Sequence, residues 1–357
     1  MNDPRSIVMI KSHSLGVGDL LRSSAAWRVL KNQWPHVQLH LVFLSKHPGY
    51  PTQGLIEQHP LLSSAHFITV RDKDPSQADG KQVDFWTIWL SVQKVLKAVN
   101  ADTVIDFEPH GLKTSLLTWL SGQTYGVTTL GIAQFPGRSI FYKCASPSVQ
   151  SFAKYHGLSL PMDYTLRDFV VLSALGLERG NTPIEMQVTK EGRDWQAIHR
   201  TRFQNGLPLI GLNIGCGTPD AMVKRPDLTH LAQCFHQLLK EQPANIVVSG
   251  APFEKDVNQT FIGLLHQLRP DTVIFDAAGQ TTLSSSSGLI DACNIFISTD
   301  SGPYHMAVAL RKPTLVWFTY AEVTSFHNHP WCRRLIQPSV ENFVLEVKDL
   351  LRLSLGA

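Results

Sequence analysis

The sequence predicts an α/β protein built from two doubly wound domains. Short apolar runs alternate with amphipathic stretches along the chain, which is typical of parallel sheets covered by helices on both faces. The alternation is interrupted at residues 176–183 (GLERGNTP), a cluster of helix and strand breakers, and then starts again. The length of 357 residues is also more than one hydrophobic core usually serves.

The first half contains apolar runs that predict strands and amphipathic stretches that predict helices. Strands are expected at residues 7–10, 38–44 and 103–106. Helices are expected at residues 20–31, 83–99, 111–120, 149–156 and 166–175. The stretch from the third of these helices to about residue 146 shows neither pattern and is expected to form loops.

The second half repeats this order. Strands are expected at residues 209–213, 245–249, 272–275, 295–298 and 314–318, and helices at residues 190–203, 228–240, 255–268, 282–291, 303–310 and 340–353. The predicted domains are therefore residues 1–182 and 183–335, and residues 336–357 are expected to form a C-terminal helix that packs back on the first domain. Two such domains are expected to face each other across a cleft, with ligands beyond the carboxyl ends of the strands.

The composition of the chain argues against several classes of protein. The chain is 43% hydrophobic and 17% charged, as in ordinary soluble proteins, and no apolar stretch predicts a membrane helix or a signal peptide. The five widely spaced cysteines favour a reducing cytoplasm over a disulfide framework. The net charge of +3 is too small to indicate nucleic-acid binding. Residues 1–180 hold 17 Lys and Arg against 13 Asp and Glu, an excess that suits an anionic partner and that chance composition explains equally well.

The first strand leads into a glycine-bearing loop, KSHSLGVG, which ends just before Asp19. Gly16 and Gly18 suggest a dinucleotide-binding turn, but Leu21 occupies the third glycine position and the second strand ends without an acidic residue, so that fingerprint fails. A tight turn that includes Ser14 remains, with Asp19 at a helix start. On spacing alone, Asp19 is more readily a helix cap than a catalytic group.

The corresponding loop of the second half contains Gly215 and Gly217, where the absence of side chains would let a ligand approach the backbone. Lys224 and Arg225 follow just before the next helix. This pair can contact a phosphate group, or it can be a solvated pair of surface cations.

The segment STDSGPYHMA, residues 298–307, carries the sharpest signal. A strand ends, small residues follow, and Pro303 occupies the expected first position of a helix. The free N–H groups of that helix start predict an anion site suited to a diphosphate, to which Ser301 can add a hydroxyl and His305 a ring N–H. The alternative is an ordinary capped helix with a packed histidine.

Other segments give weaker signals. Asp276 follows a strand, where it can accept hydrogen bonds from ribose hydroxyls or stabilise a turn, and Glu254 is a weaker candidate of the same kind. His327 and His329 are alternate loop residues without a third partner, which favours a polar loop over a metal site. Motifs of P-loop proteins, serine hydrolases and zinc proteases are absent from the sequence.

Taken together, these segments resemble the heptosyltransferase family, bacterial glycosyltransferases that build the inner core of lipopolysaccharide. The resemblance covers about residues 6–320 and rests on IVMIKSHSLGVGDLL, LIGLNIGCG with KRPDLTHLAQCF, NIVVSGAPFEKD, DAAGQTTLSS and, most specifically, ISTDSGPYHMAVALRKPTLVWF. It implies a GT-B fold, with the acceptor in the N-terminal domain and the nucleotide-sugar in the C-terminal domain.

The resemblance also implies roles for individual residues. It makes Asp19 the general base, with Ser14, Gly16 and Gly18 in the acceptor-side loop. It places Lys224, and with less support His305, on the leaving diphosphate. The donor-binding residues it implies are Asp300, Ser301, Gly302, Asp276, Gly215, Gly217 and Gly250.

The activity implied is inverting transfer of a heptose from ADP-heptose to Kdo–lipid A or a core heptose, with no metal and no cofactor. Such an enzyme is expected in the cytoplasm, at the inner face of the membrane, where its partners are the nucleotide-sugar and a lipid-linked glycan. Two alternatives stay open at this point. The enzyme can use another nucleotide-sugar or another acceptor, such as a protein, or the chain can be a nucleotide-sugar-binding protein without catalysis.

Overall fold

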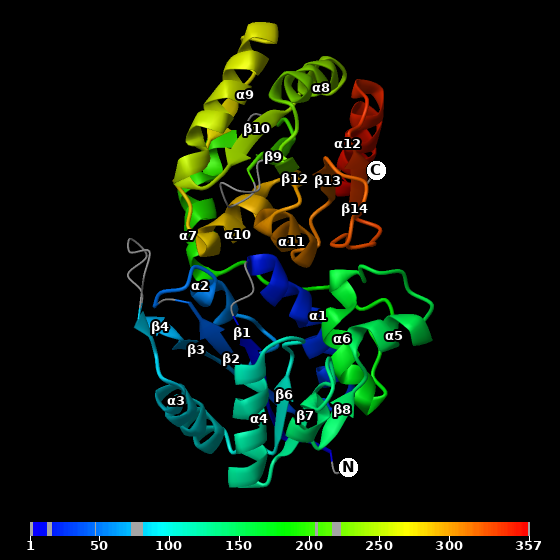
Figure 1. Ribbon diagram of the computed structural model, residues 1–357. Helices are drawn as coiled ribbons and strands as arrows, with labels where there is room; N and C mark the ends of the chain where they lie inside the picture. The colour runs from blue at the N-terminus through cyan, green and yellow to red at the C-terminus, as the bar shows by residue number, and fades with distance from the viewer. Residues whose placement is uncertain are drawn as a thin grey trace. The chain divides into compact units, whose positions relative to one another are not determined.

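The computed structural model divides the chain into two compact units, Met1–Thr182 and Pro183–Ala357 (Figure 1). It describes residues 3–12, 16–46, 48–72, 81–203, 206–215 and 223–355. Each unit contains a six-stranded sheet in which neighbouring strands are parallel, so the predicted α/β class is confirmed. No helix in these ranges is long and apolar enough to span a bilayer.

The sheet of the first unit has the order β3-β2-β1-β6-β7-β8. Its strands are β1 (Ser6–Ser12), β2 (Gln38–Ser45), β3 (Ser64–Thr69), β6 (Thr103–Asp106), β7 (Thr128–Ile132) and β8 (Cys144–Ser146), and a separate ribbon pairs β4 (Arg71–Asp72) with β5 (Lys81–Gln82). The sequence interpretation missed β3 and took β7 and β8 for loops. These strands are short or only half-buried at the sheet margins, so no apolar run marks them.

Helices cover both faces of this sheet (Figure 1). One face carries α3 (Phe85–Ala98) and α4 (Leu112–Tyr125), and the other carries α1 (Val17–Gln33) and α6 (Arg167–Leu172). The shorter elements are α2 (Gln53–Ile56), α5 (Val149–Tyr155), η1 (Arg138–Phe141), η2 (Tyr164–Leu166) and η3 (Ser173–Leu175).

The second unit repeats this plan. Its sheet has the order β11-β10-β9-β12-β13-β14, with β9 (Leu209–Asn213), β10 (Asn245–Ser249), β11 (Ile274–Asp276), β12 (Ile295–Thr299), β13 (Thr314–Phe318) and β14 (Cys332–Ile336). The sequence interpretation missed β14, an edge strand in which only Cys332 is buried. The helices are α7 (Lys190–His199), α8 (Leu228–Glu241), α9 (Lys255–Leu268), α10 (Leu283–Ala292), α11 (Gly302–Ala309) and α12 (Val340–Leu355), with the short turns η4 (Arg200–Phe203) and η6 (Pro252–Glu254).

Two glycines let helices α7 and α10 cross at backbone contact. A Cβ atom placed on Gly288 would lie 1.9 Å from the carbonyl oxygen of Gly192, a distance no side chain can occupy. This crossing holds α7, whose sequence is polar, against α10 within the second unit.

The C-terminal helix belongs to the second unit, which corrects one expectation. The sequence interpretation separated residues 336–357 and packed them on the first domain. Instead, Phe343, Val347 and Leu350 of α12 are fully buried in one core with α8 and the sheet of the second unit. The apolar stripe of this helix is used there, because a helix face of this kind must be buried by a neighbouring layer.

Strand order locates the candidate site in each unit. Counted along the chain, both sheets follow the doubly wound order 3-2-1-4-5-6. The connections therefore reverse direction between β1 and β6 in the first unit, and between β9 and β12 in the second. In sheets of this type, ligands bind outside the carboxyl ends of the strands at that reversal.

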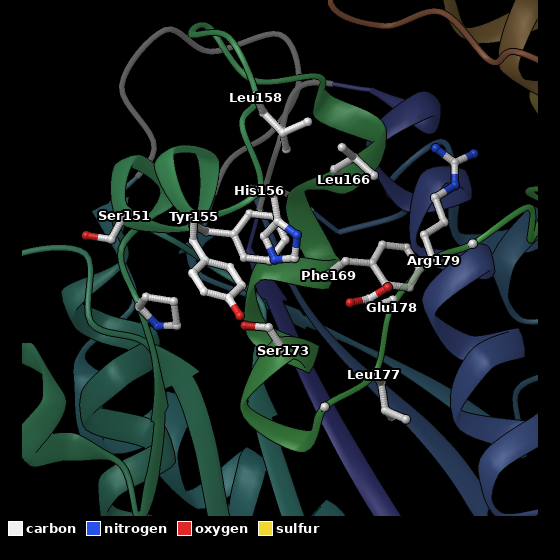
Figure 2. Close-up of a pocket in the computed structure, with 14 residues that line it drawn as sticks. Ser151, Tyr155, His156, Leu158, Leu166, Phe169, Ser173, Leu177, Glu178 and Arg179 are labelled. Atoms are coloured by element: carbon white, nitrogen blue, oxygen red, sulfur yellow. The ribbon is translucent and has the colours of Figure 1, made fainter.

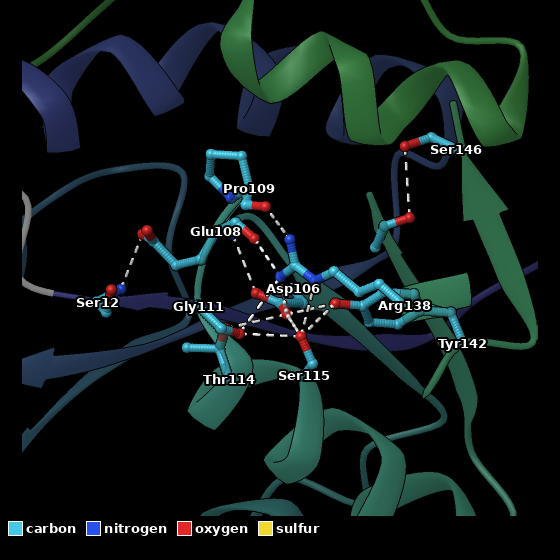
Figure 3. A network of polar contacts seen from close by, with 11 residues as sticks. Ser12, Asp106, Glu108, Pro109, Gly111, Thr114, Ser115, Arg138, Tyr142 and Ser146 are labelled. Carbon is cyan, nitrogen blue, oxygen red and sulfur yellow. Dashed lines mark hydrogen bonds and ion pairs between the residues drawn. The ribbon is translucent and has the colours of Figure 1, made fainter. Parts of the chain in front are cut away.

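A fully buried ion pair braces the first unit just beyond β6 (Figure 3). Arg138 Nη2 lies 3.3 Å from Asp106 Oδ2, and the Tyr142 hydroxyl donates to the same oxygen at 2.7 Å. Arg138 also donates to the carbonyl oxygens of Glu108 and Pro109. Burial raises the pKa of Asp106 to about 6, although the Tyr142 hydrogen bond and the Arg138 charge act in the opposite direction.

Replacing Arg138 by methionine is expected to lower the free energy of unfolding by about 3–5 kcal/mol near neutral pH, because the charged Asp106 is then buried without its partner. The loss is expected to shrink near pH 5, since a carboxyl with a pKa of about 6 is already protonated there. Urea unfolding at both pH values measures this. Lys143→Met, at an exposed cation nearby, is the control, with an expected change within about 0.5 kcal/mol. An equal loss of unfolding free energy for R138M at both pH values would contradict the role given to the buried Asp106 charge.

Candidate functional site

The strand-end loops of the second unit bring most of the predicted donor-binding residues to one edge of its sheet. Asn213 and Ser298 are register partners on β9 and β12, so the loops that follow these strands leave the sheet side by side. The Thr299 hydroxyl donates to the carbonyl oxygen of Gly215 at 2.6 Å and ties the two loops together. Gly250 follows β10, the next strand along, at the same edge.

Lys224 and Asp300 form an ion pair at this edge. Lys224 Nζ lies 2.8 Å from Asp300 Oδ2 and 3.3 Å from the carbonyl oxygen of Asp300. Tyr320 donates to the same carboxylate oxygen at 2.5 Å, and Ser325 donates to the other at 2.8 Å. Burial alone would raise the pKa of Asp300, but the hydrogen bonds from Lys224 and Tyr320 and the Lys224 charge hold it below the ordinary value.

This arrangement distinguishes the two partners of the pair. The Asp300 carboxylate is nearly buried and receives hydrogen bonds from three side chains, so it is placed to orient Lys224. The Lys224 side chain keeps 33% of its surface exposed. Two of its three N–H donors go to Asp300, which leaves one for an anion beyond the sheet edge.

Helix α11 begins at Gly302, one residue earlier than predicted, so Pro303 is its second residue and not its first. Because proline has no N–H, Gly302 and Tyr304 supply the amide groups of the first turn that no earlier carbonyl can accept. Ser301 is the N-cap, but its side chain does not cap the helix; its hydroxyl donates to Asn213 Oδ1 at 3.0 Å. Gly302 thus lies beside Asp300 at the start of an eight-residue helix.

His305 lies in the interior of this loop cluster. Only 5% of its surface is exposed, and its Nδ1 lies 2.9 Å from Nε2 of the fully buried His327. This geometry agrees with the packed-histidine alternative. His329 stacks on Trp331 with ring centroids 4.7 Å apart, and the described residues contain no group of three His, Cys, Asp or Glu able to hold a metal ion.

Gly215 and Gly250 lie against a buried protein side chain. A Cβ atom on Gly215 would lie 1.8 Å from Glu254 Oε1, and one on Gly250 would lie 3.3 Å from Glu254 Cβ. The Glu254 carboxylate is almost fully buried and accepts a hydrogen bond from the Ala251 amide at 2.7 Å. The missing side chains of these glycines therefore leave space for Glu254, the weaker of the two predicted carboxylates, and the donor-binding role of the glycines stays a prediction.

Asp276 ends β11 at the same sheet edge. Its carboxylate accepts hydrogen bonds from Gln259 Nε2 at 2.6 Å and from the Ala278 amide at 3.0 Å. The second of these bonds is the turn-stabilising contact that the sequence left open as an alternative. The side chain remains partly exposed, so its oxygens can still accept from a ligand.

Asp19 lies at the switch point of the first unit. It is the third residue of α1, while Gly16 is the N-cap and Gly18 is buried in the first turn, so Asp19 does not cap the helix. Its carboxylate pairs with Arg22, one turn later, and keeps 22% of its surface exposed. It lines a small polar pocket with Glu108, which follows β6.

Opposite charges balance one another in this pocket. Lys11 Nζ, buried at the end of β1, lies 3.0 Å from Asp168 of α6, and the Arg22 guanidinium lies 5.7 Å from the centroid of the Tyr164 ring. Arg167 flanks the same ring at 6.0 Å. A carboxylate held among cations and open to one side can accept a proton from a bound hydroxyl.

Two predicted residues, Ser14 and Gly217, lie outside the described residues. Sequence reasoning in turn missed Tyr320 and Ser325, which orient Asp300, and Arg22 beside Asp19, and it interpreted His327, the partner of His305, only as a polar loop residue. The spacing of Asp19 and Arg22, three residues apart on a helix, was a usable signal. The other three lie in an irregular loop, where no periodicity marks them.

Comparison with known proteins agrees with this architecture. Residues 89–345 match the sequence profile of glycosyltransferase family 9 (heptosyltransferase). The chain is 22% identical over 337 residues to lipopolysaccharide heptosyltransferase 3 of Escherichia coli (strain K12), covering 90% of this chain and 84% of that protein.

Two solved structures share the fold. One is a family 9 glycosyl transferase from Veillonella parvula, with a TM-score of 0.72, 18% identity and 97% of each chain covered. The other is the E. coli ADP-heptose lipopolysaccharide heptosyltransferase II, with a TM-score of 0.69, 17% identity and 99% and 100% of the two chains covered. Each unit of this chain is thus one Rossmann-like domain of the GT-B fold. The chain belongs to glycosyltransferase family 9, the heptosyltransferase family, and is a glycosyltransferase.

Proposed function

We propose that this enzyme transfers a heptose from ADP-heptose to the inner core of lipopolysaccharide, with inversion at the anomeric carbon and without a metal ion. Membership of family 9 and the names of the E. coli relatives support the donor and the acceptor class. The observation that carries the proposal is the Lys224–Asp300 pair beside the start of α11, at the switch point of the second unit.

In the proposed reaction, the acceptor hydroxyl oxygen attacks the anomeric carbon of the donor while the bond from that carbon to the diphosphate oxygen breaks. Asp19 takes the hydroxyl proton, and ADP leaves with the bonding electrons. Lys224 and the amide groups of Gly302 and Tyr304 neutralise the charge that develops on the leaving diphosphate. One carboxylate suffices, because a single displacement inverts the centre and forms no covalent enzyme intermediate.

Three residues have supporting roles in this proposal. Asp300 orients Lys224 through the 2.8 Å ion pair. Asp276 accepts hydrogen bonds from the donor ribose. His305, whose Nδ1 is hydrogen-bonded to His327, contributes to leaving-group stabilisation. We further propose that the enzyme works at the cytoplasmic face of the membrane, where a lipid-linked glycan is presented.

The nucleotide preference can be tested by thermal unfolding with ADP, UDP and GDP. ADP at about one hundred times its Kd is expected to add about 2.7 kcal/mol to the free energy of unfolding, while UDP and GDP add much less. Equal stabilisation by all three nucleotides, or a preference for UDP, would contradict the ADP assignment while leaving the family unaffected. Turnover of ADP-heptose in the presence of EDTA tests the proposed independence from metal.

A further inference from the structure

The first unit contains a second cavity, of about 710 Å³, that none of the proposed catalytic groups lines (Figure 2). Helix α5 contributes Phe152 and Tyr155, and His156 follows it directly. Their rings form one wall, with centroid separations of 4.2 Å for Phe152–His156 and 5.0 Å for Tyr155–His156. Phe169 of α6 and Leu177 line the cavity from the other elements. A volume of this size is within the range of about 300–1,000 Å³ that holds small ligands.

The chemistry of this wall selects the occupant. Rings and leucine side chains offer few hydrogen-bond partners, so a sugar bound here would leave its hydroxyls unpaired, at a cost that an alkyl chain does not incur. The polar groups among the lining residues are those of Ser151, Tyr155, His156, Ser173, Glu178 and Arg179, with Glu178 as the single carboxylate and Arg179 as the single guanidinium. Lys154 is exposed on α5 beside Tyr155 and adds a further positive charge.

Exposed apolar side chains lie at the end of α5 and in the residues that follow it. Tyr155 is 86% exposed, Leu160 55% and Tyr164 47%, within ten residues of one another. Apolar side chains gathered on a surface in this way mark sites that contact lipids or other partners. The segment from Tyr155 to Tyr164, which supplies part of the cavity wall, therefore also has an apolar outer surface.

Helix α6 connects this cavity with the pocket of Asp19. Phe169 of α6 lines the apolar cavity, while its neighbours Arg167 and Asp168 line the polar pocket that holds Asp19. A molecule with a sugar near Asp19 and an apolar chain attached to it would therefore meet the two sites on either side of one short helix.

We propose that this cavity binds an acyl chain of the anionic lipid that carries the acceptor glycan. The proposal rests on the proposed function for the identity of the acceptor. It assigns the apolar lining to the chain, and the positive charges of Arg179 and Lys154 to the anionic part of the lipid. The cavity would then raise the local concentration of acceptor at Asp19 without taking part in the chemical step.

Binding can be measured without transfer by calorimetric titration with alkyl phosphates below their micellar concentrations. Dodecyl phosphate is expected to bind, with affinity rising up to about fourfold for each methylene group added from hexyl phosphate until the cavity is filled. Inorganic phosphate tests the charged group alone and is expected not to bind here. Binding that is independent of chain length, or absent for dodecyl phosphate, would overturn the proposal.

Leu177→Asp and Leu158→Asp each place a charge in the cavity lining, and each is expected to lower the affinity for dodecyl phosphate at least tenfold. Leu90→Asp, at a leucine of α3 that is 57% exposed, is the matched control and is expected to bind as the wild type does. The second cavity variant serves if the first does not fold, as judged by circular dichroism. If the cavity variants and the control bind dodecyl phosphate equally well, the ligand does not bind in this cavity.

A comparison of acylated with deacylated acceptor separates this proposal from the proposed function. The cavity variants are expected to raise KM for the acylated acceptor toward that for the deacylated one and to leave kcat and the KM for ADP-heptose unchanged. If the wild type transfers to both acceptors with the same KM, the acyl-chain proposal fails while the transfer activity stands. If it transfers to neither acceptor but binds dodecyl phosphate with the expected chain-length dependence, the acceptor assignment fails while the lipid site stands.

Discussion

Replacing Asp19 by asparagine is expected to lower kcat about 10²–10⁴-fold, because the amide keeps the size of the side chain but cannot accept a proton. The affinity for ADP is expected to be unchanged, since the proposed diphosphate contacts are all in the second unit. Steady-state kinetics with ADP-heptose and acceptor, together with calorimetric titration of ADP, measure the two effects separately.

The matched control for this change is Asp256→Asn. Asp256 likewise lies in the first turn of a helix, α9, where it is exposed, so its replacement removes the same favourable interaction with a helix N-terminus. We expect each variant to lose up to about 1 kcal/mol of stability from this source, and only D19N to lose turnover. A variant D19N that retains more than about a tenth of the wild-type kcat would rule out Asp19 as the base.

Arg22 lies beside Asp19 in the same pocket. The guanidinium pairs with the Asp19 carboxylate in this structure. Arg22 also lies over Tyr164, beside Arg167, so it has a second contact available within the same pocket. Arg22 and Arg167 are therefore the cationic groups that an anionic acceptor would meet beside Asp19.

The sequence was sufficient to predict most of the fold because central strands of a doubly wound sheet are buried on both faces and appear as unbroken apolar runs. β1, β9 and β12 are such strands, and each was placed within two residues. β14 and β3 lie at sheet edges, and Cys332 is the only one of their residues that is fully buried. Their composition therefore resembles that of loops, and only the tertiary pairing identifies them.

The candidate site divides in the same way. Asp19, Asp300 and Gly302 could be predicted because a strand end followed by a helix start is a local pattern with a known use. The partners of Asp300 could not, since Tyr320 and Ser325 follow β13 by irregular turns. The purpose of Gly215 was also hidden, because the carboxylate that fills its missing side chain belongs to Glu254, far along the chain.

Lys224→Met is expected to lower kcat about 10²–10³-fold, the usual consequence of removing one group that stabilises a developing negative charge. It is also expected to weaken ADP binding, because the diphosphate carries its charge in the bound product as well. The methionine keeps the length of the side chain, so packing against the loop is retained. Lys240→Met, at an exposed lysine near the end of α8, is the control and is expected to behave as the wild type in both assays.

Asp300→Asn tests whether the carboxylate acts through Lys224 or on the donor itself. If Asp300 only orients the ammonium group, D300N lowers kcat less than Lys224→Met does, and the double variant is no slower than Lys224→Met alone, because the effects of residues that act as one unit do not add. Independent contacts of the two residues with the donor would instead make the losses additive. The 2.8 Å ion pair and the hydrogen bonds from Tyr320 and Ser325 favour the first result, since they leave Lys224 as the partly exposed member of the group. A variant D300N slower than Lys224→Met would contradict this hierarchy and assign the donor contact to the carboxylate.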